Sequence, residues 1–126
     1  MEPGDRMVIT LLHLRTQVKM FHWQTNSYAE HKALDKLGDR LLELNDLWVE
    51  AYQGNEHTRV NCGERCQLDL YNWTPGAPRI YLEDKVLSLQ AKRQAHWNDP
   101  RHTYLANIID EIIAALGKAL YMLTLS

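Results

Sequence analysis

The pattern of apolar and polar positions along the chain predicts four helices. In four segments the apolar residues recur at intervals of three and four, which places them on one face of an α-helix. The predicted helices span about residues 5–25, 28–53, 81–97 and 100–123. Only residues 68–73 hint at a strand or a short helical turn. We therefore expect an all-α protein.

Local signals indicate where these helices begin and end. Ser27 and, three residues later, Glu30 form a capping box at the start of the second helix. Gly54 is a suitable residue for the end of that helix. Asp99 and Pro100 supply an N-cap and a first-turn proline for the fourth. The short link before Ser27 predicts that the first two helices form an antiparallel hairpin.

A long irregular connection separates the second and third predicted helices. Residues 55–80 lack a helical period and contain Gly63, Pro75, Gly76 and Pro78. An irregular connection of this length indicates either a functional loop or a crossover along the bundle. Two hairpins joined by such a connection predict a ferritin-like four-helix bundle, with residues 1–126 forming a single domain.

Composition excludes several classes of protein. The net charge is −2 and no block of basic residues occurs, so the sequence gives no signal for nucleic-acid or anionic-membrane binding. No apolar run approaches the roughly 18 residues of a membrane span, and the first residues lack a signal-peptide pattern. We expect a cytoplasmic protein with no membrane partner.

The second helix carries more apolar positions than one bundle-facing stripe requires. Its first stripe comprises Leu34, Leu37, Leu41, Leu44 and Trp48. A neighbouring line forms a second, heptad-like seam of His31, Gly38, Leu42, Asn45 and Val49. A lone four-helix bundle needs one stripe per helix, so the seam predicts homo-oligomerisation through this helix. The alternative is simply a broad core helix.

Candidate ligands lie at both ends of this seam. Asp46 and Glu50 are four residues apart, so their carboxylates point the same way and repel unless a cation or a partner compensates. His31 lies fifteen residues earlier, about 22 Å along a helix, so one chain cannot bring these groups to one ion. Two copies paired antiparallel would bring them together, with the two-fold axis near Gly38. Glycine there would permit close approach of two backbones.

These residues resemble a known signature. The motif comprises Phe21-His22-Trp23, then His31, then Asp46-x-x-x-Glu50. Over about residues 18–54 it resembles the ferroxidase signature of Dps proteins, the miniferritins. The resemblance implies that iron, or another divalent metal, binds between subunits of a homo-oligomeric cage and that Fe(II) can be oxidised there. The implied ligands are His22, His31, Asp46 and Glu50, with Trp23 beside the site. Imidazole and carboxylate ligands with open positions suit such chemistry.

A second resemblance leads to a different class of function. The two histidines are three residues closer together than in Dps proteins, which predicts a different hairpin turn. The chain also resembles small ferritin-like proteins encoded by large viruses and phages. That resemblance implies a metal-free helical structural or assembly protein, with a viral particle as its partner and location. In that case His31 and Asp46 would be ordinary rim residues, and a histidine on a helix face is often only packed or solvated.

Other candidate sites are weaker. A di-iron site within one chain would need Glu-x-x-His motifs, and none occurs. Asp110 and Glu111 project away from the apolar stripe of the fourth helix, so we expect a solvated face. His57, Cys62 and Cys66 offer three zinc ligands but no evident fourth. We therefore favour a pair of reduced thiols.

Overall fold

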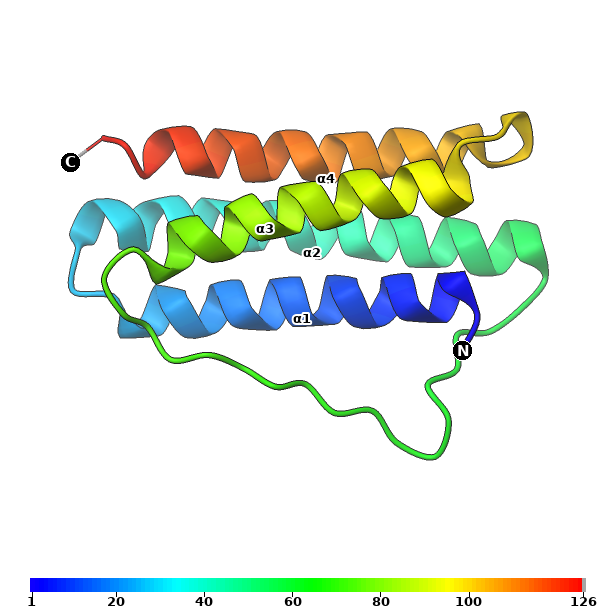
Figure 1. Cartoon of the computed structure of the whole chain (residues 1–126), viewed down its shortest axis with the longest axis horizontal. Coiled ribbons are helices and arrows are strands. Elements are labelled where there is room, and N and C mark those ends of the chain that lie inside the picture. The colour runs from blue at the N-terminus through cyan, green and yellow to red at the C-terminus, as the bar shows by residue number, and fades with distance from the viewer. Residues whose placement is uncertain (126) are drawn as a thin grey trace.

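Four helices make up most of the chain (Figure 1). The structure, a computed structural model, describes residues 1–125. The long helices are α1 (Pro3–Gln24), α2 (Tyr28–Glu56), α3 (Ala77–Lys92) and α4 (Thr103–Met122). A five-residue π-helical turn, η1 (Arg93–Trp97), extends α3, and a 3₁₀ turn, η2 (Pro100–His102), precedes α4. No strand occurs among the described residues. The predicted all-α class with four helices is confirmed.

The helices run side by side as two antiparallel pairs. Figure 1 shows α1 and α2 running in opposite directions, as do α3 and α4. Because α2 and α3 run in the same direction, the chain between them must travel the length of the bundle. Residues 57–76 do so as an irregular segment along the outer side of α1 (Figure 1). We call this segment the strap.

The two predicted N-caps are present, with one change of partner. The Ser27 hydroxyl accepts a hydrogen bond from the Glu30 amide at 3.2 Å. The Glu30 carboxylate does not reach back to Ser27 as a capping box would. Instead, it accepts a 2.6 Å hydrogen bond from the indole of Trp73 in the strap. Asp99 caps η2 by accepting from the Arg101 amide.

Two predicted helix boundaries are wrong. α2 continues beyond Gly54 to Glu56, and His57 ends it in the left-handed conformation (φ 51°), with its amide bonded to the Gln53 carbonyl. α3 begins at Ala77 rather than near residue 81. Pro78 explains the earlier start, because the fixed φ and missing N–H of proline suit the first turn of a helix.

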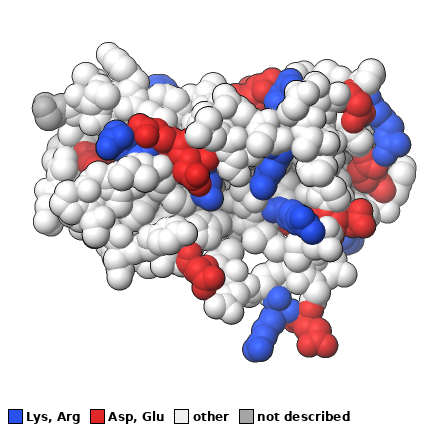
Figure 2. Space-filling view, viewed as in Figure 1, with Lys and Arg blue, Asp and Glu red and all other residues white. Residues whose placement is uncertain are grey.

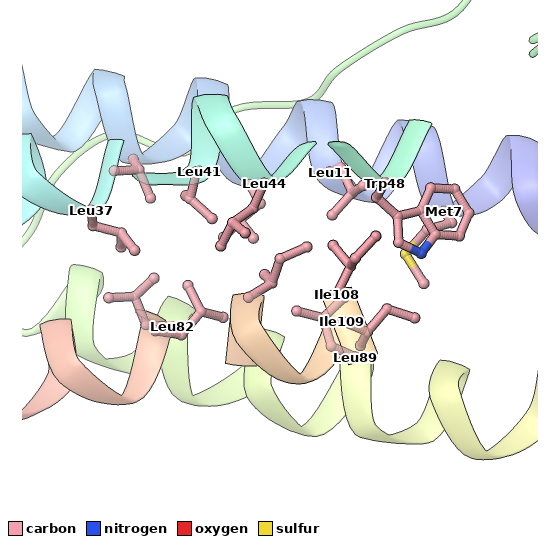
Figure 3. Close-up of a cluster of buried hydrophobic side chains, with 14 of the residues drawn as sticks. Met7, Leu11, Leu37, Leu41, Leu44, Trp48, Leu82, Leu89, Ile108 and Ile109 are labelled. Atoms are coloured by element: carbon pink, nitrogen blue, oxygen red, sulfur yellow. The ribbon is translucent and has the colours of Figure 1, made fainter. Parts of the chain in front are cut away.

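The core lies where the facing stripes of the helices meet (Figure 3). The predicted stripe of α2, from Leu34 to Trp48, is buried throughout. It packs against residues of the other three helices: Met7, Leu11, Leu14, Val18, Phe21, Tyr81, Leu82, Leu89, Leu105, Ile109, Ile112 and Leu116. Leu12 of α1 lies outside this core, with 40% of its surface exposed. It lies one position beyond the buried stripe.

Side chains of α1 hold the strap against the bundle. The amide of Gln17, which is completely buried, donates to the Tyr71 carbonyl at 2.9 Å and accepts from the Tyr71 amide at 2.7 Å. His13 contacts the Asp69 carbonyl through Nε2 and the Tyr81 hydroxyl through Nδ1. The Asp69 carbonyl only accepts, so Nε2 carries the proton, and Nδ1 of the neutral ring accepts from the Tyr81 hydroxyl. Burial raises the pKa of Tyr81, which keeps that hydroxyl protonated. The strap is thus held mainly through its backbone.

The cysteines of the strap are joined in a disulfide. Cys62 and Cys66 were expected as reduced thiols, but the structure bonds them to each other. Disulfide sulfurs are not thiolates, so this state has no zinc site built from His57 and the two cysteines.

The surface is mixed in charge. Acidic and basic side chains are interspersed over the face shown in Figure 2. Within residues 1–125, no helix combines the length and the apolarity that crossing a membrane would require.

Candidate metal centre at the hairpin

The turn between α1 and α2 brings two predicted ligands together. The imidazole rings of His22 and His31 stack with their centroids 3.9 Å apart and an interplanar angle of 21°. His22 is almost fully buried, with 8% of its surface exposed, whereas His31 is partly exposed. The three-residue turn between the helices makes this approach possible.

Each histidine is locked by the backbone of the other. Nδ1 of His22 bonds the His31 carbonyl at 3.1 Å, and Nδ1 of His31 bonds the His22 carbonyl at 2.9 Å. A carbonyl oxygen only accepts, so each Nδ1 must carry the proton. In the neutral rings Nε2 is then the unprotonated nitrogen. A ring whose other N–H donates to a carbonyl is the usual arrangement for a metal-ligating histidine.

A carboxylate that the sequence analysis did not single out lies beside them. Oδ1 of Asp35 is 3.8 Å from Nε2 of His22. Asp35 lies four residues after His31 and hence on the same face of α2. That spacing was the available signal, but an acidic residue on a helix surface is too common to stand out.

His22 and Asp35 line a groove between α1 and α2, and His31 lies outside its lining. The groove has a volume of about 370 Å³ and is formed by Arg15, Thr16, Lys19, Met20, His22, Trp23, Leu34, Asp35, Gly38, Asp39 and Leu42. Trp23, predicted to lie beside the site, is 67% exposed at this groove, with the Lys19 ammonium 5.6 Å from its ring centroid.

The other two predicted ligands lie far along α2. Asp46 and Glu50 are both exposed, and neither forms an ion pair with a described residue. α2 is continuous from Tyr28 to Glu56, so Asp46 stands about 22 Å from His31 at 1.5 Å per residue. Among residues 1–125, no three histidine, cysteine or acidic side chains lie close enough to hold an ion. One chain alone therefore does not assemble the four predicted ligands.

The predicted seam divides into an outer and an inner part. Gly38 and Leu42 line the groove, and Leu42 is 47% exposed. Asn45 was expected in the same outer line, but it is buried and its amide donates to the Leu11 carbonyl at 3.1 Å. It contributes to packing between α1 and α2. Val49 packs partly against the core.

A second polar cluster, which the sequence analysis missed, closes the opposite end of the bundle. The His102 imidazole lies between two carboxylates, with Nε2 2.7 Å from Glu56 and Nδ1 2.8 Å from Asp99. The hydrogen bond to Asp99 raises the pKa of His102, and the bond to Glu56 adds to this against the opposing effect of burial. The same bond lowers the pKa of Asp99. Asp99 and His102 are three positions apart, but Glu56 lies 46 positions before His102, so no local pattern predicts the complete cluster.

Comparison with known proteins places the chain in a family without assigning an activity. No curated protein and no solved structure matches it. The pattern of a family of unknown function, DUF5856, matches residues 22–123, a stretch that contains both histidines and all three carboxylates of the hairpin and seam. The chain therefore belongs to the DUF5856 family.

Proposed function

We propose that this chain is a Dps-like iron-binding protein with a ferritin-like bundle, which binds Fe(II) at sites shared between two copies. The observation that carries the proposal is the reciprocal bonding of His22 and His31. It fixes the tautomer of both rings and leaves each Nε2 able to act as a ligand. Asp35, 3.8 Å from one of these nitrogens, adds a carboxylate. A continuous α2 and a strap running the length of the bundle agree with ferritin-like connectivity.

A second copy supplies what one chain lacks. Antiparallel pairing of two α2 helices about Gly38 would bring Asp46 and Glu50 of the partner subunit to the histidines of the first. The groove at Gly38 and Leu42 offers the surface for that contact, because its floor is open and Leu42 is exposed. The completed set would hold two imidazoles and up to three carboxylates. Such mixed ligands suit Fe(II), and open positions would admit an oxidant such as dioxygen.

The test is Fe(II) titration by calorimetry without oxygen, on wild type and on two variants. His31→Ala and Asp46→Ala should each abolish micromolar binding. Mixed after subunit exchange, they should recover roughly one intact site per mixed dimer, because one chain keeps His31 and the other keeps Asp46. His96→Ala is the matched control, since His96 is exposed and lies outside the hairpin. Binding should also weaken as the solution is acidified, because a protonated imidazole cannot bind a metal ion.

Two results would overturn the proposal. If mixing the variants restores nothing, the ligands do not come from two chains. If wild type binds neither Fe(II) nor Zn(II) at micromolar concentration, the metal-free structural or assembly protein becomes the better account, and the exposed groove serves packing alone.

A further inference from the structure

A different face of α2 carries a charge pattern that fits a second copy of the chain. Lys36, Arg40, Glu43 and Leu47 follow the spacing i, i+4, i+7 and i+11, so they lie along one face of the helix. Leu47 is 50% exposed, and the Arg40 and Glu43 side chains are 48% and 72% exposed. The stripe is basic in its first half and acidic and apolar in its second.

The basic half borders a groove between α2 and α4. This groove has a volume of about 400 Å³ and is lined by Ala33, Lys36, Leu37, Arg40, Glu111, Ala114, Ala115, Lys118, Ala119 and Met122. Its floor is apolar and buried, since Ala33, Leu37 and Ala119 are each at most 3% exposed. Three cations and one carboxylate stand on its walls. A partner that docks in this groove should therefore present an apolar side chain with an acidic side chain beside it.

The second half of the same stripe meets that description. In an antiparallel pairing centred between residues 41 and 42, Arg40 lies level with Glu43 of the partner subunit. In the same register the partner's Leu47 lies level with Lys36, above the floor of the groove. The two-fold axis repeats both contacts, as a symmetric dimer requires. One register thus satisfies the charged and the apolar positions together.

We propose that this stripe, with the α2–α4 groove, is a self-complementary docking surface for a second copy of the chain. In the single chain Arg40 bonds Glu43 at 3.0 Å and approaches Glu111 at 3.8 Å. In the dimer, the Arg40–Glu43 contact within each chain is replaced by a contact between Arg40 of one chain and Glu43 of the partner subunit. The surface is separate from the α1–α2 groove and needs no metal, so it does not depend on the proposed function.

The test uses two charge reversals whose defects cancel only between chains. In Arg40→Glu both positions 40 and 43 are acidic, and in Glu43→Arg both are basic. Because position 40 of one chain faces position 43 of the other, each variant alone brings like charges together in the dimer. Each should weaken association by roughly tenfold or more, measured by sedimentation velocity without metal. An equal mixture should regain the wild-type association, because every pair across that interface is then opposite in charge. Mixing cannot restore a contact within a chain, so a recovery would show that the two residues meet between chains.

Arg79→Glu and Glu83→Arg provide the matched control. That pair is also exposed, bonded at 3.1 Å and spaced by one turn, but it lies on α3 away from the groove. Reversing either charge of the Arg79–Glu83 pair should leave the association of the chains unchanged. A monomeric wild type, reversals at residues 40 and 43 without effect, or a mixture that stays dissociated would each overturn the proposal.

Discussion

At the scale of single residues, the histidines of this chain differ in which ring nitrogens remain free. His22 and His31 use only Nδ1 within the chain, against carbonyl oxygens. His102 uses both nitrogens, each against a carboxylate. A ring between two acceptors is best satisfied when both nitrogens carry protons. The first pair is therefore suited to bind a further group, and His102 to hold two elements together as a cation.

The position of His102 predicts a dependence of stability on pH. The pKa of His102 is higher in the folded chain than in the unfolded chain, where it is near 6.5. Protonated His102 therefore stabilises the fold fully below about pH 6.5, and this stabilisation is lost as the pH rises through the pKa of the folded chain. The melting temperature of wild type should fall between pH 6 and pH 9 by several degrees more than that of His102→Gln. Thermal unfolding followed by circular dichroism measures both. Equal pH slopes for the two proteins would show that the Glu56–His102–Asp99 contacts do not stabilise the charged ring.

The sequence shows residue types and spacings but not tautomers or long-range partners. His22 and His31 could be selected because both flank a predicted turn. Their mutual locking could not, since it depends on the turn bringing the two rings within 3.9 Å. Asp35 and Glu56 escaped notice because isolated acids on helices are ordinary. Only their contacts with His22 and His102 distinguish them.

At the scale of elements, periodicity predicts the helices well and the strap poorly. An apolar stripe is repeated every three or four residues, so α2 and α4 were readily located. The strap has no repeat, because α1 side chains such as Gln17 bind its backbone. Backbone atoms are the same in every residue, so this attachment leaves no pattern in the strap sequence.

The strap should loosen when its central attachment is removed. Gln17→Leu leaves the amide and carbonyl of Tyr71 without their partner, at a cost of about 1–3 kcal/mol in the free energy of unfolding. Hydrogen exchange at the Tyr71 amide should accelerate markedly, while exchange within α2 changes little. Gln67→Leu is the control, because Gln67 is exposed and bonds only the nearby Asp69 side chain. Unchanged exchange at Tyr71 would mean that other contacts hold the strap.

At the scale of the whole molecule, α2 has exposed surface on both flanks of its buried stripe. Its inner stripe fills the core, one flank borders the groove with α1 and the other borders the groove with α4. Leu42 and Leu47 are exposed on opposite flanks. The extra apolar positions of α2 were visible in the sequence. The sequence could not show that these positions form two separate outer faces, or that Asn45 is buried. Both depend on where α1 and α4 pack against α2.

Gly38 offers a direct test of assembly through the α1 flank. A Cβ atom added at Gly38 or at Gly117 would meet nothing within 4 Å in the single chain. Replacing either glycine by leucine should therefore raise helix stability by somewhat under 1 kcal/mol. Only Gly38→Leu should also lower the mass of the assembly in light scattering, because only Gly38 lies at the proposed two-fold axis. If both variants keep the wild-type mass, helices do not cross at Gly38.

The attachment of the strap through its backbone has a consequence for evolution. At exposed strap positions such as Leu70, selection acts on the path that the chain takes more than on the side chain, whereas Trp73 is also held by its indole, which donates to Glu30. Exposed positions such as Leu70 can therefore diverge among relatives while the path stays the same. Gln17 lies on α1 and supplies two of the bonds that fix this path, so we expect its replacement to be more restricted than changes at exposed strap positions. Exposed positions of the strap can thus change in sequence while the path of the chain is retained.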